Sequence, residues 1–298
     1  MKKSSNLNGF TVDLGGTKIA AARILNGAIV ERNQSKTEGN ANHKQQILAM
    51  GELLDRLGYR RGDTLGVAVS GRVDRSGVWH AVNLRTLTKI NSVRIVEEIK
   101  SAIGPASVIN DAAAATLAEA TLGSGVGYKN FGYITISTGV GGGLVLGGRL
   151  LESENGLAGH IGFSSSPHAN ELCGSGRFGT VESVAGGNSI ARAAARIGYN
   201  GLDGRAVFEH AGLGEEWAEA IIETSANTVA NLCADLTTML GLQAVFLGGS
   251  IGMASGYMER IRAHLEQLPV IFHPELYRSI LGSDGPLLGA LLYRNAFL

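Results

Sequence analysis

Two segments of the chain repeat one pattern, in which three short apolar strands follow one another through glycine-rich turns. The first segment, FTVDLGGTKIAAARILNGAIVE, begins at residue 10, and the second, FGYITISTGVGGGLVLGGRLLE, begins at residue 131. In the first segment, Asn26-Gly27 between two β-rich runs is a strong hairpin signal. Two halves that open in the same way predict a duplicated α/β fold of two lobes with a central cleft.

The remaining segments alternate between short apolar runs and amphipathic helices, as in sheets built from βαβ units. The expected helices are 42–58, 95–103, 112–123 and 215–240, and the expected buried strands are 64–71, 106–111 and 244–252, the last ending in a glycine turn. We expect an N-terminal lobe over residues 1–120, to which a helix at about 285–298 returns, and a second lobe over 121–284 with a loop at 156–183.

The length and charge of the chain limit the functions it can serve. Its 298 residues exceed one typical core, and 26 basic residues balance 26 acidic ones, so nucleic acid or an anionic membrane is not expected as the main partner. No apolar run is long enough for a membrane span. Cys173 and Cys233 are too few for a disulfide framework, and no leader sequence opens the chain, so we expect a reduced, cytoplasmic protein.

Three glycine-rich turns are candidate phosphate-binding loops, because converging backbone N–H groups can bind phosphate oxygens. They are DLGGTK at 13–18, STGVGGG at 137–143 and LGGS at 247–250. In the first turn, Thr17 adds a hydroxyl group, and Asp13 could hold Mg²⁺ through water. The turns match neither the Walker pattern nor the dinucleotide-binding pattern. Taken alone, the first turn is as readily an ordinary hairpin turn with a hydrogen-bonded Asp13.

The acidic residue Asp111 follows a buried strand and begins an alanine-rich helix. A carboxylate at this place could accept the proton of a hydroxyl group that attacks a γ-phosphate. On composition alone Asp111 is more readily the N-cap of the helix, since Asn and Asp are favoured at that position. The tripeptide SGR at 70–72 lies at the carboxyl end of another buried strand, where ligands bind in open α/β sheets.

Taken together, the three turns resemble those of the superfamily of sugar kinases, actin and Hsp70. Within it, VDLGGTKIAAA, VINDAAAATLAEA, ISTGVGGGLV and GLAGHIGF resemble the ROK family of repressors and sugar kinases, over residues 10 to 293. The resemblance implies a two-lobed, actin-like or hexokinase-type ATPase fold with duplicated ribonuclease H-like lobes. It is strongest for bacterial N-acetylmannosamine kinases, in which LAGHIGH stands where glucokinases of the family have AGE-x-GH.

The resemblance implies roles for individual residues. Asp111 matches the family's catalytic base, which also contacts the sugar. The other implied sugar ligands are Gly71, Arg72, Asn83, Asn110, His160 and Glu182. Nucleotide and phosphate binding is implied for Asp13, Gly15, Gly16, Thr17, Lys18, Thr138, Gly139, Val140, Gly141, Gly142, Gly248 and Gly249, with Mg²⁺ bound through water at Asp13. Without the resemblance, Arg72 would be interpreted as a solvated side chain. In the same way, Glu182 would be interpreted as a residue of a surface helix, and His160 as a polar residue of a loop.

The implied activity is phosphorylation of the 6-hydroxyl of N-acetylmannosamine by ATP, which gives N-acetylmannosamine 6-phosphate in sialic acid breakdown. A glucokinase, fructokinase or other hexose kinase of the family is the alternative; His160 argues against a glucokinase, and Phe163 leaves the choice of sugar open. A DNA-binding repressor is less favoured, because such repressors carry a DNA-binding segment before the first turn, and twelve residues precede Asp13 here. The alternative outside enzymes is a sugar-sensing, repressor-like protein without a DNA-binding domain. The implied partners are the sugar, ATP with Mg²⁺, and a second copy of the chain.

Family members with a structural zinc bind it through the histidine of a Gly-His pair and three cysteines of C-x-C-G-x-x-G-C. The four matching positions hold Phe163, Cys173, Ser175 and Thr180. Of the four ligands, only Cys173 therefore remains. If His168 took the place of a lost ligand, the number would be two, whereas a structural zinc site needs four. We expect no structural zinc, and we expect packing of Phe163 and hydrogen bonds from Ser164, Ser165 and Ser175 to hold the loop.

Overall fold

The computed structural model describes residues 6–83 and 86–295, and the chain separates into two compact units. Unit 1 comprises Met1–Val126, Leu150–Ala158 and Leu281–Leu298, and unit 2 comprises Gly127–Arg149 and Gly159–Ile280. The first unit therefore extends past residue 120. It also takes in Leu150–Ala158, a segment that the sequence placed in the second lobe.

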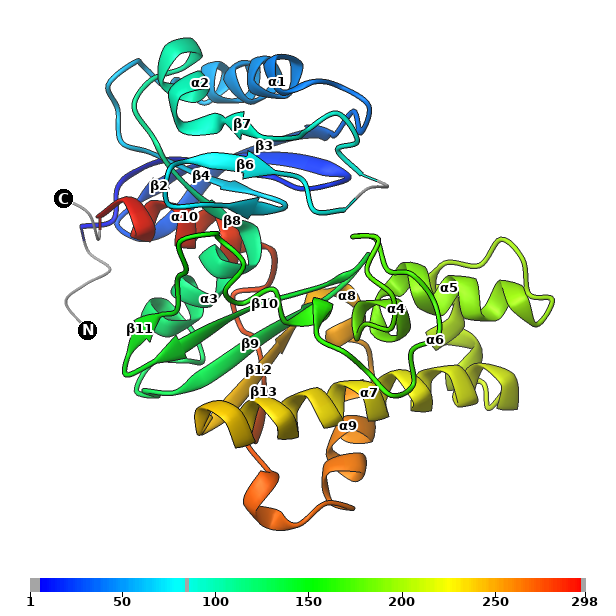
Figure 1. Ribbon diagram of the computed structural model, residues 1–298. Coiled ribbons are helices and arrows are strands. Elements are labelled where there is room, and N and C mark those ends of the chain that lie inside the picture. The colour runs from blue at the N-terminus through cyan, green and yellow to red at the C-terminus, as the bar shows by residue number, and fades with distance from the viewer. Residues whose placement is uncertain (1–5, 84–85, 296–298) are drawn as a thin grey trace. The chain divides into compact units, whose positions relative to one another are not determined.

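Unit 1 is built on a five-stranded sheet with the order β3-β2-β1-β4-β8 (Figure 1). Its strands are β1 (Gly9–Leu14), β2 (Lys18–Leu25), β3 (Ala28–Lys36), β4 (Leu65–Val69) and β8 (Ser107–Asn110). The first three strands are antiparallel neighbours, whereas β4 runs parallel to β1 and β8 parallel to β4. Asn26 and Gly27, which join β2 to β3, have φ values of 52° and 80°. Positive φ at both positions is what a two-residue type I′ turn requires, which confirms the predicted hairpin.

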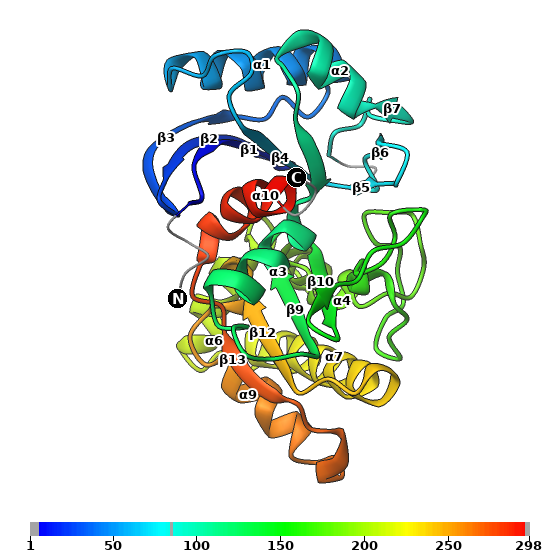
Figure 2. The ribbon, with the colours of Figure 1, turned by 90° about the vertical axis from the view of Figure 1, so that its left-hand side faces the viewer.

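Alternating side chains give the sheet of unit 1 two different faces. The large side chains of Leu14, Ile19 and Val67 pack against α1 (His43–Arg56) and α2 (Ile95–Ala102). The opposite face presents small side chains, such as those of Ala22 and Ala68, to α10 (Gly285–Asn295). Figures 1 and 2 show α1 and α2 on one side of this sheet and α10, beside α3 (Asp111–Leu122), on the other. Both predicted helices of the first face and the predicted helix at 112–123 are confirmed.

Glycine residues let α10 approach the sheet and α3 closely. A Cβ atom on Gly66 of β4 would overlap the backbone of Ala290, and one on Gly289 of α10 would overlap the carbonyl group of Ala114 in α3. Backbone therefore packs on backbone at both contacts, and Leu291 of α10 is completely buried.

A second, three-stranded sheet of unit 1 was not predicted. It consists of β5 (Arg72–Val73), β6 (Val78–His80) and β7 (Val93–Arg94), in that order. Strands of two or three residues are too short to show a period in the sequence. This sheet buries Trp79, whose indole N–H donates a hydrogen bond of 2.9 Å to the carbonyl oxygen of Ser70. It thereby fixes the backbone that enters the SGR tripeptide.

Unit 2 repeats the strand order of unit 1 as β11-β10-β9-β12-β13. Its strands are β9 (Phe131–Ile136), β10 (Val140–Leu146), β11 (Arg149–Leu150), β12 (Ala244–Gly248) and β13 (Glu275–Arg278). β10 is antiparallel to β9, β12 is parallel to β9, and β13 is parallel to β12, as in unit 1. The predicted duplication is confirmed. It includes the edge strand β13, which was not predicted.

The long helix α7 is the centre of the helical part of unit 2. The helices are α4 (Glu182–Ala185), α5 (Gly187–Arg196), α6 (Gly204–Gly212), α7 (Glu216–Leu240), α8 (Gly249–Gly252) and α9 (Tyr257–Leu265), and the 3₁₀ turns are η1 (Ile161–Phe163) and η2 (Val270–Phe272) in this unit and η3 (Gly282–Asp284) in unit 1. α7 contacts α4, α5, α6 and α9 and ends at Gly241 with φ 62°, which confirms the predicted helix. β12 runs directly into α8, so the glycine turn expected there is wrong.

None of the helices in the described part of the chain, α7 included, combines the length and the hydropathy that a membrane span needs.

We expect Gly289→Ala to lower the free energy of unfolding by roughly 1 to 3 kcal/mol, because the added methyl group forces α10 away from α3. Gly51→Ala is the matched control: Gly51 lies within α1, and a Cβ there would come no closer than 3.8 Å to the side chain of Ile103. That control should gain about 0.5 to 1 kcal/mol from lost chain entropy and better helix propensity. Thermal and urea denaturation measure both changes, and equal effects of the two substitutions would contradict the close packing of α10.

Candidate active site

In unit 1, the turn between β1 and β2 places Asp13 at the end of β1. The N–H of Gly15 closes the turn by donating a hydrogen bond of 2.9 Å to the carbonyl oxygen of Lys18. The hydroxyl of Thr37 donates to the carbonyl oxygen of Gly15 at 2.8 Å and so holds the turn from β3. Thr17 and Lys18 are exposed, where they can meet a ligand from solvent.

Asn110 ends β8 and caps α3. Its Oδ1 accepts a hydrogen bond of 2.9 Å from the N–H of Ala113, and its Nδ2 donates to the carbonyl oxygen of Gly71 at 2.8 Å and to Oδ1 of Asp111 at 2.9 Å. Asp111 is therefore the first residue of α3, and the alternative that it serves as the N-cap is wrong. Its Oδ1 also accepts from the N–H of Ala112 at 2.8 Å, so two donors hold the carboxylate in one orientation.

Asp13 and Asp111 both have a raised pKa. Burial, reinforced by the charge of Asp111 and opposed by Lys18 and Arg32, raises the pKa of Asp13 to about 7. Burial also raises the pKa of Asp111 to about 6, against the hydrogen bonds that favour its charged form. Two acidic groups thus titrate near neutral pH, as is common at catalytic sites.

The residues around Asp13 fit a magnesium ion. Its Oδ1 is buried and has no hydrogen-bond partner among the described residues. A buried carboxylate oxygen without a partner, beside a second carboxylate, suits a divalent cation that keeps water ligands. Within residues 6–83 and 86–295, no three His, Cys, Asp or Glu side chains gather in a way that could hold a metal by themselves. Mg²⁺ commonly takes one or two carboxylates and completes its shell with phosphate oxygens and water.

The structure brings Gly71 and Asn110 together, as the preceding hydrogen bond shows. Gly71 has φ 106°, a conformation that favours glycine. The guanidinium of Arg72, which is half-buried, donates a hydrogen bond of 2.5 Å to the carbonyl oxygen of Asn155 in the segment Leu150–Ala158. Asn83 is half-buried.

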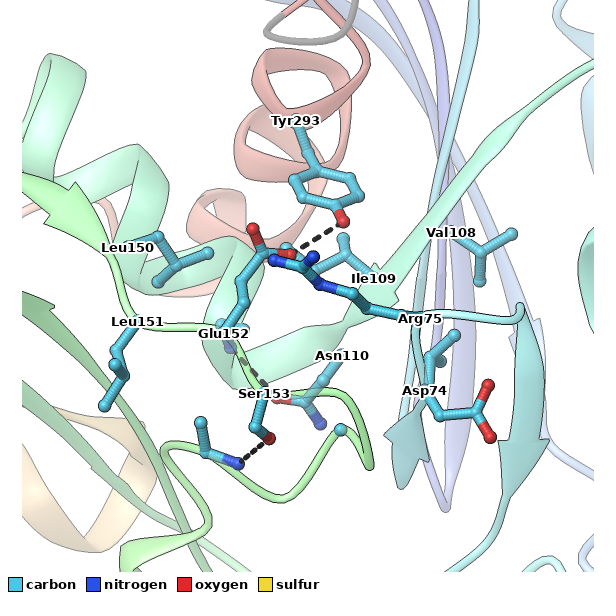
Figure 3. Close-up of a pocket in the computed structure, with 14 residues that line it drawn as sticks. Asp74, Arg75, Val108, Ile109, Asn110, Leu150, Leu151, Glu152, Ser153 and Tyr293 are labelled. Atoms are coloured by element: carbon cyan, nitrogen blue, oxygen red, sulfur yellow. Dashed lines mark hydrogen bonds between the residues drawn. The ribbon is translucent and has the colours of Figure 1, made fainter.

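A pocket of about 70 Å³ opens beside Asn110 (Figure 3). Its lining includes Val73 and Ile109 from unit 1 strands and Glu152 from the segment Leu150–Ala158. In Figure 3, Tyr293 of α10 points toward Glu152, and its hydroxyl donates a hydrogen bond of 2.8 Å to Oε1. The sequence did not predict that Glu152 lines this pocket, because nothing in it indicates that the segment Leu150–Ala158 returns to unit 1.

In unit 2, the turn between β9 and β10 is shorter than the predicted phosphate loop. It consists of Ser137, Thr138 and Gly139, whereas the predicted residues from Val140 onward, Gly141 and Gly142 included, lie in β10. Thr138 is exposed. The N–H of Val140 donates a hydrogen bond of 3.1 Å to Oε2 of Glu182 and therefore points into the protein.

Glu182 is 9% exposed, so the surface-helix alternative for this residue is wrong. Its Oε1 accepts a hydrogen bond of 3.0 Å from the N–H of Gly174, and its Oε2 accepts the one from Val140. A Cβ atom on Gly139 would overlap the same Oε2, so a side chain at that position would displace this carboxylate from its present place. Glu182 thereby connects the 137–139 turn with the loop that was expected to bind sugar.

His160 precedes η1, and its ring stacks on that of Phe163 with 5.9 Å between centroids and 23° between planes. The expected packing of Phe163 is therefore found against the candidate sugar ligand. η1 rests directly on β10, because Cβ atoms on Gly142 and Gly162 would overlap the side chain of Ile161 and the carbonyl group of Val140 respectively.

The third predicted glycine turn is the junction of β12 and α8. Gly249 begins α8 with φ 81°, and a Cβ there would overlap the carbonyl group of Ile136 in β9. Gly248 packs equally closely on the ring of Tyr133. In the 137–139 turn, the carbonyl oxygen of Ser137 accepts a hydrogen bond of 2.8 Å from the N–H of Gly187. Ile136, which Gly249 contacts, is the last residue of β9, and the 137–139 turn follows it directly. Within unit 2, the junction and the turn therefore both lie at the carboxyl end of β9.

The predicted fold and the motifs agree with the known proteins that are similar to the chain. The sequence profile of the ROK family matches residues 10–295. N-acetylmannosamine kinases of Haemophilus influenzae (strain PittEE) and Escherichia coli O9:H4 (strain HS) are each 38% identical to it, over 94% of this chain and over 92% and 96% of their own lengths. The crystal structure of a ROK hexokinase from Thermus thermophilus is 31% identical, with a TM-score of 0.80 over 97% of this chain and 99% of that chain. The predicted hexokinase-type fold is therefore confirmed.

We expect Asp13→Asn to stabilise the metal-free protein at alkaline pH. Since the pKa of Asp13 is raised to about 7, the folded protein binds this proton more tightly than the unfolded chain, and the resulting stability is complete at low pH and lost as pH rises through 7. In EDTA, the substitution should raise the free energy of unfolding by roughly 2 to 4 kcal/mol at pH 8 and by almost nothing near pH 4. Asp55→Asn, at an exposed position of α1, is the control. A gain that stays constant between pH 4 and pH 8 would count against a buried, charged Asp13.

Proposed function

The chain belongs to the ROK family, and from this membership we propose that it transfers the γ-phosphate of ATP to the 6-hydroxyl of N-acetylmannosamine. The 38% identity to N-acetylmannosamine kinases over 94% of the chain is the observation that carries the proposal. The product would be N-acetylmannosamine 6-phosphate, formed in the breakdown of sialic acid. The orientation and raised pKa of Asp111 support a proton-transfer step of this kind.

In the proposed reaction, Asp111 accepts the proton of the 6-hydroxyl group while the oxygen of that hydroxyl group forms a bond to the γ-phosphorus. The bond between the γ-phosphorus and the bridging oxygen of ADP breaks, and ADP leaves with that electron pair. A carboxylate with a pKa of about 6 is largely ionised at neutral pH, yet it binds a proton more tightly than an ordinary aspartate. Bound Mg²⁺ would neutralise negative charge on the phosphates, and Asp13 is the residue that would hold it through water.

The other residues are proposed to bind the two substrates. For the sugar we propose Gly71, Arg72, Asn83, Asn110 and Asp111 of unit 1 and His160 and Glu182 of unit 2. For the nucleotide we propose Asp13, Gly15, Gly16, Thr17 and Lys18 of unit 1 and Thr138, Gly139, Val140, Gly141, Gly142, Gly248 and Gly249 of unit 2. Val140 is the exception in this set. Because its N–H already donates to Glu182, we propose that Val140 supports the nucleotide turn from behind and does not itself donate to phosphate.

A reduced, cytoplasmic location and a homodimeric assembly also belong to the proposal. Cys173 and Cys233 are both free and buried, which is compatible with a reducing compartment. The expected absence of a structural zinc stays a prediction.

An assay of ADP release with N-acetylmannosamine, N-acetylglucosamine, glucose and fructose tests the proposal. We expect the highest kcat/KM with N-acetylmannosamine, because the chain is similar to kinases of this sugar. The chain is also 31% identical to a ROK hexokinase, so a preference for glucose would replace the proposed substrate and keep the kinase. If Mg²⁺ and ATP support no turnover of any sugar, the proposed activity is wrong.

We expect Asp111→Asn to lower kcat by roughly 100- to 10,000-fold, because an amide cannot accept the proton of the hydroxyl group. An asparagine can still accept the hydrogen bonds from Ala112 and Asn110, so sugar affinity measured by calorimetry should change by less than about threefold. Asp55→Asn again serves as the control and should keep the wild-type kcat. A normal kcat in Asp111→Asn would remove Asp111 from the role of base.

A further inference from the structure

We propose that Arg177 is a positioning residue for His160 and that it acts through η1. The proposal rests on the proposed function, because it takes His160 as a sugar ligand. Its physical basis is a side-chain connection, within unit 2, between η1 and a neighbouring loop that we call the arm (residues 171–179).

The arm is a narrow hairpin. Leu172 and Phe178 form a β-bridge, and the N–H of Cys173 donates a hydrogen bond of 3.0 Å to the carbonyl oxygen of Arg177. The N–H of Gly176 donates to the carbonyl oxygen of Cys173 at 3.1 Å, and the φ of 81° at Gly176 makes this tight turn possible. The backbone of Arg177 is thus part of the hairpin, while its side chain reaches out of it.

Other residues hold the arm in place independently of the Arg177 side chain. Glu171 at its base forms ion pairs with Arg192 at 3.4 Å and with Arg196 at 3.2 Å, both from α5. Nearer its tip, the N–H of Gly174 donates to the buried carboxylate of Glu182. Loss of the Arg177 side chain should therefore leave the arm where it is.

The guanidinium of Arg177 connects the arm to the segment that follows His160. It donates a hydrogen bond of 2.5 Å to the carbonyl oxygen of Phe163 and one of 3.1 Å to the hydroxyl of Ser165. A planar guanidinium that serves two acceptors at once restrains both position and orientation. Since Phe163 is the last residue of η1 and stacks on His160, a fixed Phe163 restrains the imidazole ring.

The contact with β10 restrains η1 from the other direction. The close fit of Gly142 against Ile161 and of Gly162 against Val140 prevents η1 from moving toward the strand. η1 therefore lies between β10 and the guanidinium of Arg177. The segment after it is also held by backbone, because the N–H of Val181 donates a hydrogen bond of 2.9 Å to the carbonyl oxygen of Ser164 and the N–H of Ser166 donates one of 3.0 Å to that of Gly179. Loss of Arg177 would leave these bonds in place and remove the hydrogen bond at Phe163.

The serines that were expected to hold this loop do not replace Arg177. The hydroxyl of Ser164 donates to the carbonyl oxygen of Ile161, inside its own segment, and that of Ser175 lies 2.9 Å from the sulfur of Cys173, inside the arm. Ser165 connects the two segments by accepting from Arg177. Arg177 thus adds two side-chain hydrogen bonds to the backbone hydrogen bond between Ser166 and Gly179.

Steady-state kinetics of Arg177→Ala, Arg177→Lys and the control Arg205→Ala, at an exposed position of α6, test the proposal. We expect Arg177→Ala to raise the KM for the sugar by roughly 3- to 10-fold, with kcat and the KM for ATP within about twofold of wild type. Arg177→Lys should recover part of the loss, because one ammonium group can serve one of the two acceptors. A general loss of folding would instead lower the apparent kcat and the melting temperature and leave both KM values unchanged.

Hydrogen exchange in the same variants separates this proposal from the proposed function. Arg177→Ala should speed exchange of the amides of residues 163 and 164, which donate hydrogen bonds within and next to η1, while those of residues 173–176 keep the wild-type rate because Glu182 and Glu171 still hold the arm. An unchanged sugar KM in Arg177→Ala, or unchanged exchange at residues 163 and 164, overturns the proposal. If the wild-type chain turns over no sugar, the proposed function fails, whereas the exchange measurement still decides whether Arg177 restrains η1.

Discussion

The side chain of Asn110 makes the three hydrogen bonds on which the candidate site of unit 1 depends. With one amide group it caps α3, orients the carboxylate of Asp111 and binds the carbonyl oxygen of Gly71. A strand end, a helix start and a loop with unusual backbone geometry therefore meet at a single residue. All four hydrogen-bonding sites of an amide are directional, so this arrangement specifies asparagine at position 110 and leaves little room for another side chain. The chemistry of Asp111 follows from that restraint together with burial.

Much of the fold could be predicted from the sequence, because the signals lie in contiguous segments. The two strand–turn–strand repeats predicted the duplicated sheets, and the alternation of large and small residues in β4 matches the two faces seen in unit 1. The short strands β5, β6 and β7 and the edge strand β13 give no periodic signal of their own. The return of Leu150–Ala158 to unit 1 could not be predicted, since it depends on contacts between residues far apart in the chain, such as those of Arg72 with Asn155 and of Tyr293 with Glu152.

The candidate site was predictable as a set of residues but not as a set of contacts. The motifs pointed to Asp13, Asp111 and Glu182. Composition alone favoured an N-cap over a role in the site for Asp111, and a surface position as readily as such a role for Glu182. The structure gives the cap to Asn110 and buries Glu182 between two backbone N–H groups. Arg177 was not predicted at all, because a lone arginine in a glycine-rich loop has no pattern that indicates a bridge to a residue 14 positions earlier.

The close packing of α10 has a consequence for the order in which the chain can fold during synthesis. Residues up to Val126 supply all five strands of the unit 1 sheet, but the helix that covers the small-residue face begins only at Gly285, after the whole of unit 2. Until α10 has been synthesised, the sheet face with Gly66, Ala22 and Ala68 lacks the helix that covers it, and its small apolar residues are exposed. Unit 1 therefore cannot complete its core as it leaves the ribosome, whereas every strand and helix of the unit 2 core is available before α10 is made.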